Sequence, residues 1–328
     1  MKKFVALLIS IVTVLTLAAC GKKNNSEIDW AKTSLKSSYT IGAVEGAPTL
    51  SLVNVADSGF TYTDNNKSVT TNVTIAADAK DILAKMKRGD VDMGIMPVNI
   101  AVQLYGDNSK HEFRLATVNV FGGIYMIGNT DVSDIGELKG KVVNCVGYGG
   151  TPGLVLKHLL EQNNVPYVEG ANATSSDKVF INAISKPAEA KTEYVVLAEP
   201  AVTTNIASSQ KKVVLDFKKE WQKIHGENST FTQAGLVVNV SKVNKKYLQA
   251  LVEHLKENRN YLYNNIADIN SKLEAMGATG PIKSFPYTAE ILNRCNIDCK
   301  TAISMKADIE AFLTANNVEL PDKSFYLL

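Results

Sequence analysis

Short apolar runs typical of strands alternate with segments of helical periodicity, and this alternation constrains the fold more than any other feature of the chain. In the first part of the sequence the predicted strands cover 38–44, 69–75, 91–96, 115–120 and 124–127. Helices are expected between them at 48–56, 78–88 and 97–105. Strands that alternate with single helices indicate an α/β sheet.

The same pattern then repeats. Further strands are predicted at 141–146, 193–197, 212–215 and 234–240, with helical segments at 152–162, 179–184 and 200–208. The tail is mostly helical, with one long amphipathic helix from Tyr247 to Leu262 and two more at 267–276 and 306–314. No Ser/Gly linker divides the 328 residues. We therefore expect two interleaved α/β lobes rather than two domains in a row.

The N-terminus has the pattern of an export signal. Met1, Lys2 and Lys3 form a short positive region, and residues 4–19 are uncharged and mainly apolar. The run ends in Leu-Ala-Ala-Cys, which is similar to the lipobox of bacterial lipoproteins. That similarity implies a signal peptide at 1–19, a lipidated Cys20 and a tether over 20–36. The protein is then expected outside the cytoplasm, attached to the cell membrane by its lipid.

The charge balance excludes one large class of function. Without Lys2 and Lys3 the chain carries 33 basic and 33 acidic residues. Bulk attraction to polyanions is therefore not a mechanism for this protein, and we expect no nucleic-acid partner.

The cysteines and histidines predict no metal site. Cys145 lies in an apolar strand pattern and is expected to be a buried core residue. Cys295 and Cys299 have no histidine or acidic ligand at metal spacing, and their own spacing does not decide between a disulfide and free thiols. The four histidines are scattered along the chain: His111, His158, His225 and His254.

Ligands of open α/β sheets bind beyond the carboxyl ends of the strands, which selects several loops of this chain. The loops are 45–49, 97–99, 119–123, 149–151 and 199–201. Each offers backbone N–H groups or short polar side chains. The candidate ligand-binding residues in the loops other than 149–151 are Glu45, Gly46, Pro48, Thr49, Pro97, Asn99, Asn119, Gly122, Glu199 and Pro200.

The glycine-rich stretch 147–153 follows a predicted strand and opens a helix, so it places N–H groups and a positive helix end at one point. Gly149, Gly150 and Thr151 are its candidate contacts, and Tyr148 is a candidate stacking residue. A dinucleotide fingerprint fails because Pro152 stands where its last glycine is needed, and no Gly-Lys-Ser/Thr follows for a phosphate-binding Walker loop. A turn without any ligand stays open. We expect no cofactor.

Catalytic motifs are missing from the sequence. It contains neither G-x-S-x-G nor H-E-x-x-H. No pair of carboxylates differs from ordinary solvated charge. The sequence therefore predicts a binding protein rather than an enzyme.

Several stretches, taken in order, resemble one family. They are IGAVEGAPTL (41–50), DILAKMKRGDVDMGIMPVNIAVQLY (81–105), DIGELKGKVV (134–143), GYGGTPGLVLKHLL (147–160), LAEPAVTTNIA (197–207) and LPDKSFYLL (320–328). The chain resembles the substrate-binding lipoproteins of ABC importers in the nitrate/sulfonate/taurine group, which includes binders of thiamine pyrimidine precursors.

The resemblance implies a type 2 periplasmic-binding-protein fold, with a ligand held in the cleft between two interleaved lobes. Lobe 1 would comprise 37–127 plus 232–328, and lobe 2 would comprise 128–231. The same loops, with Tyr148, would bind a small organic solute of sulfonate, pyrimidine or vitamin-precursor type. An ABC permease with its ATPase would receive the solute. The loops lack an obvious Arg or Lys, which leaves a neutral heterocycle open. The alternative is an exported enzyme on the same scaffold that acts on a small heterocycle through a cleft acid such as Glu45 or Glu199.

Overall fold

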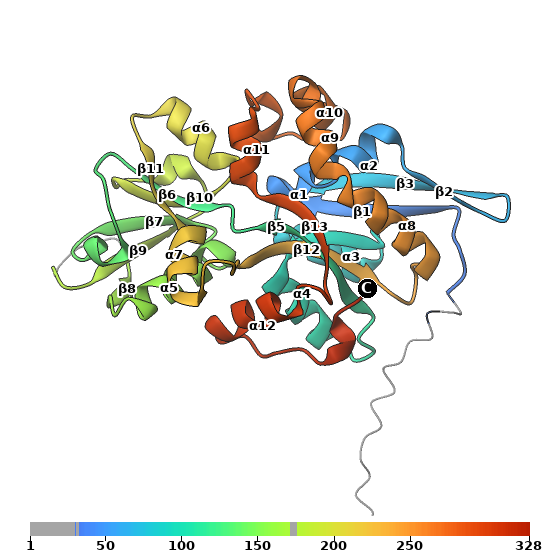
Figure 1. The fold of residues 1–328 in the computed structure, drawn as a ribbon, viewed down its shortest axis with the longest axis horizontal. Helices are drawn as coiled ribbons and strands as arrows, with labels where there is room; N and C mark the ends of the chain where they lie inside the picture. Colours follow the sequence, from blue (N-terminus) through green and yellow to red (C-terminus); the bar gives the residue numbers. More distant parts are fainter. Residues whose placement is uncertain (1–29, 31–32, 171–175) are drawn as a thin grey trace, which may run out of the picture.

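The computed structural model describes residue 30 and residues 33–170 and 176–328. The expected signal peptide (1–19), the expected lipidated Cys20 and most of the expected tether lie outside the described residues. The described chain forms two β-sheets, each with helices packed on it, that lie side by side (Figure 1). We call the part built on the seven-stranded sheet lobe 1 and the part built on the six-stranded sheet lobe 2.

The lobe 1 sheet combines strands from both ends of the chain. Its order is β13 (Ile297–Thr301), β5 (Phe113–Phe121), β12 (Thr232–Asn239), β4 (Met93–Pro97), β1 (Ser38–Val44), β3 (Lys67–Ala76) and β2 (Thr61–Asp64). β1 pairs in parallel with both β3 and β4, whereas β12 runs antiparallel to β4 and β5. The carboxyl ends of β1, β3 and β4 therefore meet at one edge of the sheet.

The lobe 2 sheet is formed by the middle of the chain. Its order is β11 (Lys212–Asp216), β6 (Ile124–Gly128), β10 (Tyr194–Ala198), β7 (Val142–Val146), β9 (Val179–Ile184) and β8 (Tyr167–Glu169). β7, β8, β9 and β10 are parallel, and β6 is antiparallel to β10. The carboxyl ends of β7 and β10 lie at the edge that faces lobe 1.

The chain passes between the sheets twice. The first crossing, at Gly122 and Gly123, joins β5 to β6, and the second joins α7 (Phe217–His225) to β12. The first crossing shifts the boundary between the lobes. Residues 124–127 are expected in lobe 1, but they belong to β6, which pairs with β10 and β11 in lobe 2. The apolar pattern is continuous from β5 to β6, so it hid the crossing. Gly122 has φ +60° there, a conformation that favours glycine.

The helices begin and end at local signals that the sequence carries. Asp78 accepts hydrogen bonds from the backbone N–H groups of Lys80 and Asp81, which starts α3, and Gly89 in the left-handed region ends it. The helices are α1 (Ala47–Leu50), α2 (Val53–Ser58), α3 (Ala79–Arg88), α4 (Val98–Asp107), α5 (Thr151–Gln162), α6 (Ala201–Ser208), α7, α8 (Lys245–Lys256), α9 (Asn258–Asn264), α10 (Ile269–Ala275), α11 (Ala289–Cys295) and α12 (Lys306–Ala315).

Three expected helices differ from the structure. Residues 179–184 form strand β9, because they pair with the parallel neighbours β7 and β8 on either side, and their first three side chains are buried. The expected helix 48–56 is divided into α1 and α2. The expected long helix from Tyr247 to Leu262 is likewise divided into α8 and α9.

The largest core cluster extends across both lobes. Trp221 of α7 is 1% exposed and packs on Phe231 and on Phe312 of α12, the helix near the C-terminus (Figure 1). Cys145, Cys295 and Cys299 are all buried free thiols, so no disulfide joins the last two. Burial raises the pKa of Cys145 and of Cys299 to about 12 in each case.

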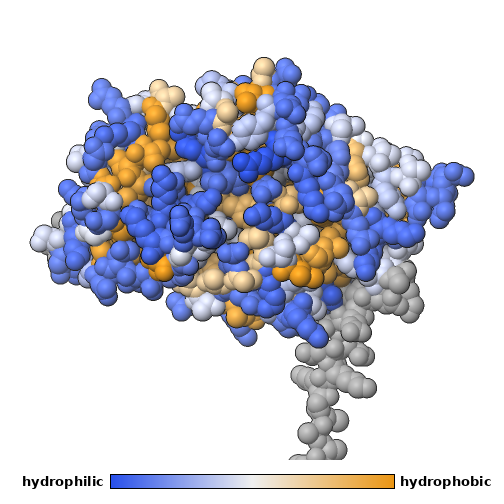
Figure 2. Space-filling view, in the orientation of Figure 1, coloured by the Kyte–Doolittle hydropathy of each residue, from blue (hydrophilic) through white to orange (hydrophobic). Residues whose placement is uncertain are grey.

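On the face that Figure 2 shows, most of the surface is hydrophilic and the apolar side chains form separate patches. Among the described residues no helix has the length and apolar character needed to cross a membrane.

Candidate functional site

A cavity of about 460 Å³ lies between the lobes, at the strand edges described above. Small, apolar and glycine residues form most of its wall, with a few charged side chains. The lining residues are Val44, Glu45, Gly46, Ala47, Pro48, Asp78, Ala79, Lys80, Pro97, Ile100, Gln233 and Ala234 from lobe 1, and Gly147, Gly149, Gly150, Thr151, Pro152, Ala198 and Glu199 from lobe 2. We call this cavity the cleft.

The lobe 1 wall begins directly after β1. Gly46 has φ +118°, and Pro48 occupies the first turn of α1. The hydroxyl of Thr49 donates to the carbonyl of Val44, 2.9 Å away, which closes this turn. Thr49 is fully buried and does not line the cleft, so it shapes the loop instead of facing a ligand.

Glu45 brings a carboxylate to this wall. Its Oε1 is buried and has no hydrogen-bond partner in the described chain. The carboxylate lies against the backbone of Gly280, where an added Cβ would stand 2.1 Å from Oε1. A side chain at position 280 would therefore require the Glu45 carboxylate to move. A buried carboxylate oxygen without a donor is also unfavourable by itself.

The lobe 2 wall is the glycine-rich turn between β7 and α5. Gly147 has φ +72°, and its carbonyl accepts the N–H of Gly150 at 2.8 Å. Thr151 is the first residue of α5 and is 2% exposed, yet its hydroxyl has no partner among the residues that the structure describes. Gly149 has open space where a side chain would begin. The turn therefore presents a positive helix end and a free hydroxyl to the cleft.

Glu199 lines the cleft, but its carboxylate is already engaged. Its Oε1 accepts hydrogen bonds from Nε of Arg294 at 2.7 Å and from the hydroxyl of Thr203 at 3.0 Å, and its Oε2 accepts the Thr203 N–H at 3.2 Å. Arg294 belongs to α11 of lobe 1, so this ion pair connects the lobes. We call it the interlobe clasp.

Burial raises the pKa of the Glu199 carboxyl, while Arg294 and Thr203 oppose that rise. Two further hydrogen bonds hold Arg294 in place. Arg294 also donates to Glu290 at 2.9 Å, and its carbonyl accepts the hydroxyl of Tyr125 at 3.1 Å. Glu199 is therefore better placed to hold the lobes together than to contact a ligand.

The structure places eight of the candidate residues on the cleft wall and six elsewhere. Glu45, Gly46, Pro48, Pro97, Gly149, Gly150, Thr151 and Glu199 line the cleft, and Thr49, Asn99, Asn119, Gly122, Tyr148 and Pro200 do not.

Three of the residues outside the lining make contacts elsewhere in the fold. Asn119 is 1% exposed and accepts a hydrogen bond from the Thr117 hydroxyl within β5. The hydroxyl of Tyr148 donates to Glu169 at 2.6 Å, and Gly122 lies against the side chain of Lys218. Proximity in sequence to a strand end does not fix where the side chain points.

Sequence reasoning missed Asp78, Lys80 and Gln233 on the cleft wall. The signal for the first two was present, because they follow β3, a strand parallel to β1 whose carboxyl end lies at the same edge. Gln233 stands at the start of β12, whose next residue Ala234 pairs with Pro97. The amino end of an antiparallel strand meets the carboxyl end of its neighbour, so this position also belonged to the site.

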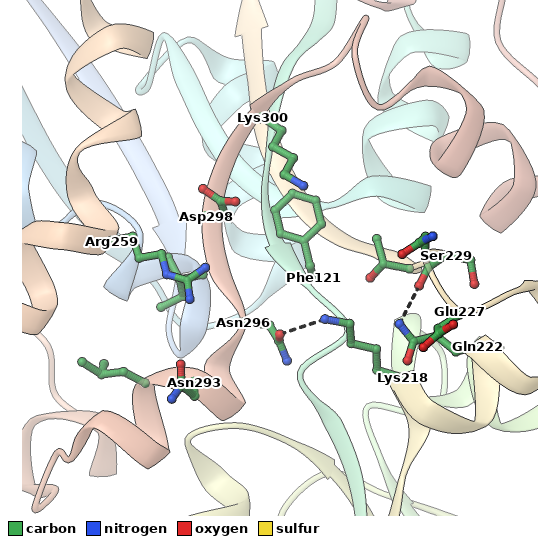
Figure 3. A pocket seen from close by; sticks show the side chains of 14 residues that line it. Phe121, Lys218, Gln222, Glu227, Ser229, Arg259, Asn293, Asn296, Asp298 and Lys300 are labelled. Carbon is green, nitrogen blue, oxygen red and sulfur yellow. Dashed lines mark hydrogen bonds between the residues drawn. The ribbon is translucent and has the colours of Figure 1, made fainter.

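A second cavity of about 400 Å³ lies beside the two crossings (Figure 3). Its wall is polar and charged, and Nζ of Lys218 in lobe 2 donates to Asn296 Oδ1 in lobe 1 at 3.2 Å. We call it the hinge pocket. It is lined by Phe121, Lys218, Gln222, Glu227, Asn228, Ser229, Thr230, Arg259, Leu292, Asn293, Asn296, Ile297, Asp298 and Lys300.

Neither cavity is lined by a cluster of potential metal ligands. Within 33–170 and 176–328 no three His, Cys, Asp or Glu side chains come together as metal ligands. His158 of α5 and His225 of α7 form a pair, with their Nε2 atoms 2.8 Å apart. Both rings pack against Trp221, and neither residue lines either cavity.

Comparison with solved structures agrees with this architecture. An ABC transporter protein from Parabacteroides distasonis is 18% identical, with a TM-score of 0.68 over 89% of this chain and 99% of that chain. The periplasmic aliphatic sulphonate binding protein of Escherichia coli is 12% identical, with a TM-score of 0.60 over 90% of this chain and 92% of that one.

A third structure is the ligand-binding component of an ABC-type import system from Staphylococcus aureus, solved with zinc bound. It is 12% identical, with a TM-score of 0.61 over 89% of this chain and 97% of that chain.

The fold is that of a periplasmic binding protein. The predicted fold class, two interleaved α/β lobes around a cleft, is thereby confirmed. No protein-family model and no curated protein matches the sequence. The likeness therefore concerns the fold alone, since each identity is below a fifth.

Proposed function

We propose that this protein is an extracytoplasmic solute-binding lipoprotein that delivers a small organic solute to an ABC import permease. The observation that carries the proposal is the cleft: about 460 Å³ between two lobes, with buried polar atoms from opposite lobes, Glu45 Oε1 and Thr151 Oγ1, that have no partner in the described chain. Buried polar atoms are normally hydrogen-bonded, so these two are suited to contact a ligand.

The solute would bind between the walls and draw the lobes together by a hinge motion at the two crossings. The proposed contacts are Glu45, Gly46, Pro48, Pro97, Gly149, Gly150 and Thr151. Closure shifts only as far as the ligand binds the closed form more tightly than the open one. The closed complex would then present both lobes to the permease.

Attachment to the membrane would come from a lipid on Cys20, which belongs to the same proposal. The apolar run before Cys20 and its lipobox-like ending support this anchor. Replacing Cys20 with Ser should release the protein from the membrane fraction. A protein that stays with the membranes after this change would contradict the anchor and leave the binding function untouched.

The enzyme alternative is not favoured by the cleft residues. Glu199 is committed to Arg294 and Thr203, and Glu45 has no nucleophile or second titrating partner hydrogen-bonded to it in the described chain. Binding without turnover is the simpler use of such a site.

Native mass spectrometry of the protein purified without denaturation tests the proposal. A co-purified small molecule, followed by calorimetry and small-angle scattering with that molecule, should show binding together with a smaller radius of gyration. A panel of sulfonates, pyrimidines and flavins that neither binds nor compacts the protein would contradict it. Conversion of a bound molecule during long incubation would favour the enzyme instead.

A further inference from the structure

Five charged side chains line the hinge pocket, and within the described residues none of them forms an ion pair. They are the cations Lys218, Arg259 and Lys300 and the acids Glu227 and Asp298. On the cleft wall, by contrast, the Glu199 carboxylate is neutralised by Arg294. The charges of the hinge pocket therefore remain available to a molecule inside it.

The three cations come from both lobes. Lys218 belongs to α7 of lobe 2, whereas Arg259 and Lys300 belong to α9 and β13 of lobe 1. Figure 3 shows Arg259 and Lys218 extending into the pocket from opposite sides, and Nζ of Lys300 lies 5.5 Å from the ring centre of Phe121. A negatively charged group in this space would accept hydrogen bonds from both lobes, and the planar guanidinium fork suits an oxyanion in particular.

Lys218 is held in position by the first crossing. A Cβ added at Gly122 would stand 3.2 Å from the Lys218 Cβ, so the side chain lies directly against the crossing backbone. Its Nζ donates to Asn296 Oδ1 at 3.2 Å, and the Asn296 carbonyl accepts the N–H of Phe121 at 3.0 Å. One of the three ammonium donors is used in this way, and the others are left for a ligand.

The rest of the wall suits hydroxyl groups. Asn228, Asn293 and Ser229 supply amides and a hydroxyl, which can donate to and accept from a ligand hydroxyl. The ionised carboxylates of Glu227 and Asp298 only accept, so they need a donor. An inorganic anion would bind the cations and oppose these acids, whereas a neutral sugar would leave the cations unused. A hydroxylated molecule with one anionic group uses both.

We infer that the hinge pocket is an accessory binding site for a small, hydroxyl-rich phosphate ester. Lys218, Arg259 and Lys300 bind the phosphate, and the carboxylates and amides of the wall bind the hydroxyls. The pocket, of about 400 Å³, shares no lining residue with the cleft. The inference therefore goes beyond the proposed function and does not rest on it. A molecule held by Lys218 and Arg259 joins α7 of lobe 2 to α9 of lobe 1 beside both crossings.

Three probes separate the two halves of such a ligand. Calorimetry at constant ionic strength would compare glucose 6-phosphate with glucose, which lacks the anion, and with inorganic phosphate, which lacks the sugar hydroxyls. Glucose 6-phosphate should bind at least about tenfold more tightly than either of them.

Two variants test the phosphate contacts. Lys218→Gln and Arg259→Gln should each lower the affinity for glucose 6-phosphate about tenfold and leave that for glucose within about twofold, because only the phosphate loses a charged donor. Lys219→Gln is the matched control. It removes an exposed cation from the next position of α7, outside the pocket lining, and should change neither affinity.

A third variant tests the hydroxyl contacts. In Asp298→Asn the amide oxygen can still accept the Cys299 N–H, as the carboxylate does at 2.8 Å. The affinity for inorganic phosphate should rise because a like charge is removed, while that for glucose should fall. The preference for glucose 6-phosphate over inorganic phosphate should therefore decrease about threefold or more. A merely structural role of Asp298 would shift all three affinities in the same direction.

Three results would overturn the inference. They are glucose 6-phosphate that binds no better than inorganic phosphate, an affinity for it that is unchanged in both Lys218→Gln and Arg259→Gln, and displacement by it of the co-purified molecule, which would place the ester in the cleft. Each of them leaves solute binding in the cleft in place, so the inference and the proposed function can fail separately.

Discussion

The cleft and the hinge pocket have similar volumes, about 460 and 400 Å³, and both lie between the lobes, yet their walls differ. The cleft is formed by loop backbone, prolines and alanines, and it contains buried polar atoms without partners. The hinge pocket is lined by long charged and amide side chains, of which Lys218 and Asn296 bond to each other. Among the described residues, the two cavities therefore differ in the unsatisfied polar atoms of their walls rather than in volume.

The largest expected difference is between the two polar contacts that connect the lobes, which should contribute unequally to the free energy of unfolding. Arg294→Ala leaves the Glu199 carboxylate buried without its cation and should cost about 3 kcal/mol of unfolding free energy at pH 7. Lys218→Ala removes the hydrogen bond from the Lys218 ammonium group to the side-chain amide of Asn296 beside the hinge pocket. It should lower the free energy of unfolding by about 1 kcal/mol or less. Chemical denaturation measures both.

A second substitution checks the cause of the Arg294 effect. Adding Glu199→Gln to Arg294→Ala removes the stranded charge and should restore part of the lost stability. Equal losses for Arg294→Ala and Lys218→Ala would mean that the clasp is no stronger than an ordinary surface contact.

Filling the cleft should weaken ligand binding strongly, whereas filling the hinge pocket should leave it nearly unchanged. Gly149→Trp places a ring where the structure has open space on the cleft wall. It should lower the affinity for the co-purified molecule by about 100-fold or more, which corresponds to about 2.7 kcal/mol of binding free energy. Asn228→Trp fills the hinge pocket and should leave the affinity within about threefold. Calorimetry of the two variants decides the comparison, and the reverse result would move the ligand site to the hinge pocket.

The histidine pair on α5 and α7 predicts how acid acts on lobe 2. Burial lowers the pKa of His158 and of His225 below the ordinary value of 6.5, and His225 adds to the effect at His158. The unfolded chain then binds protons that the folded chain does not. The stabilisation is therefore complete above pH 6.5 and is lost as the pH falls below it.

Denaturation at pH 7.5 and 5.5 measures this loss. His225→Asn should make the stability depend less on pH over this interval. Gln222→Asn, on the same helix α7 and without a titrating group, is the control and should keep the dependence of the native protein. An unchanged dependence in His225→Asn would assign the acid sensitivity to other groups.

The smallest expected effect concerns the support of Glu45. Gly280→Ala would place a methyl group against Oε1 of Glu45, at the end of a flexible side chain that can move aside. Stability should change by about 0.5 kcal/mol or less, while the affinity for the co-purified molecule should fall severalfold. A full loss of folding would mean that Gly280 is needed for the backbone and not for the carboxylate.

Sequence patterning predicted the alternating elements because their causes are local. β1 occupies residues 38–44 as expected, and Asp78 and Gly89 set the ends of α3 by their own side chain and backbone. The prediction of a helix at 179–184, where the structure has strand β9, was wrong. These six residues, half of them buried, have no hydrophobic period that distinguishes a strand from a helical turn. Its state is decided by β7 and β8, which lie far away in sequence.

The candidate site was predictable to the extent that it follows sheet topology. Gly149, Gly150 and Thr151 follow a strand and open a helix, so one sequence was enough to place them. The partner of Glu199 was not predictable, because Arg294 is 95 residues away and only the return of the chain to lobe 1 brings α11 beside α6. Long-range ion pairs leave no trace in local spacing.

Hydrogen–deuterium exchange with and without the co-purified molecule tests the central claim most directly. If the solute is held between the lobes, protection should rise together in 45–49 of lobe 1 and 149–154 of lobe 2 and stay unchanged in 227–230 and 296–298. Protection in one lobe only, or around the hinge pocket instead, would contradict the account.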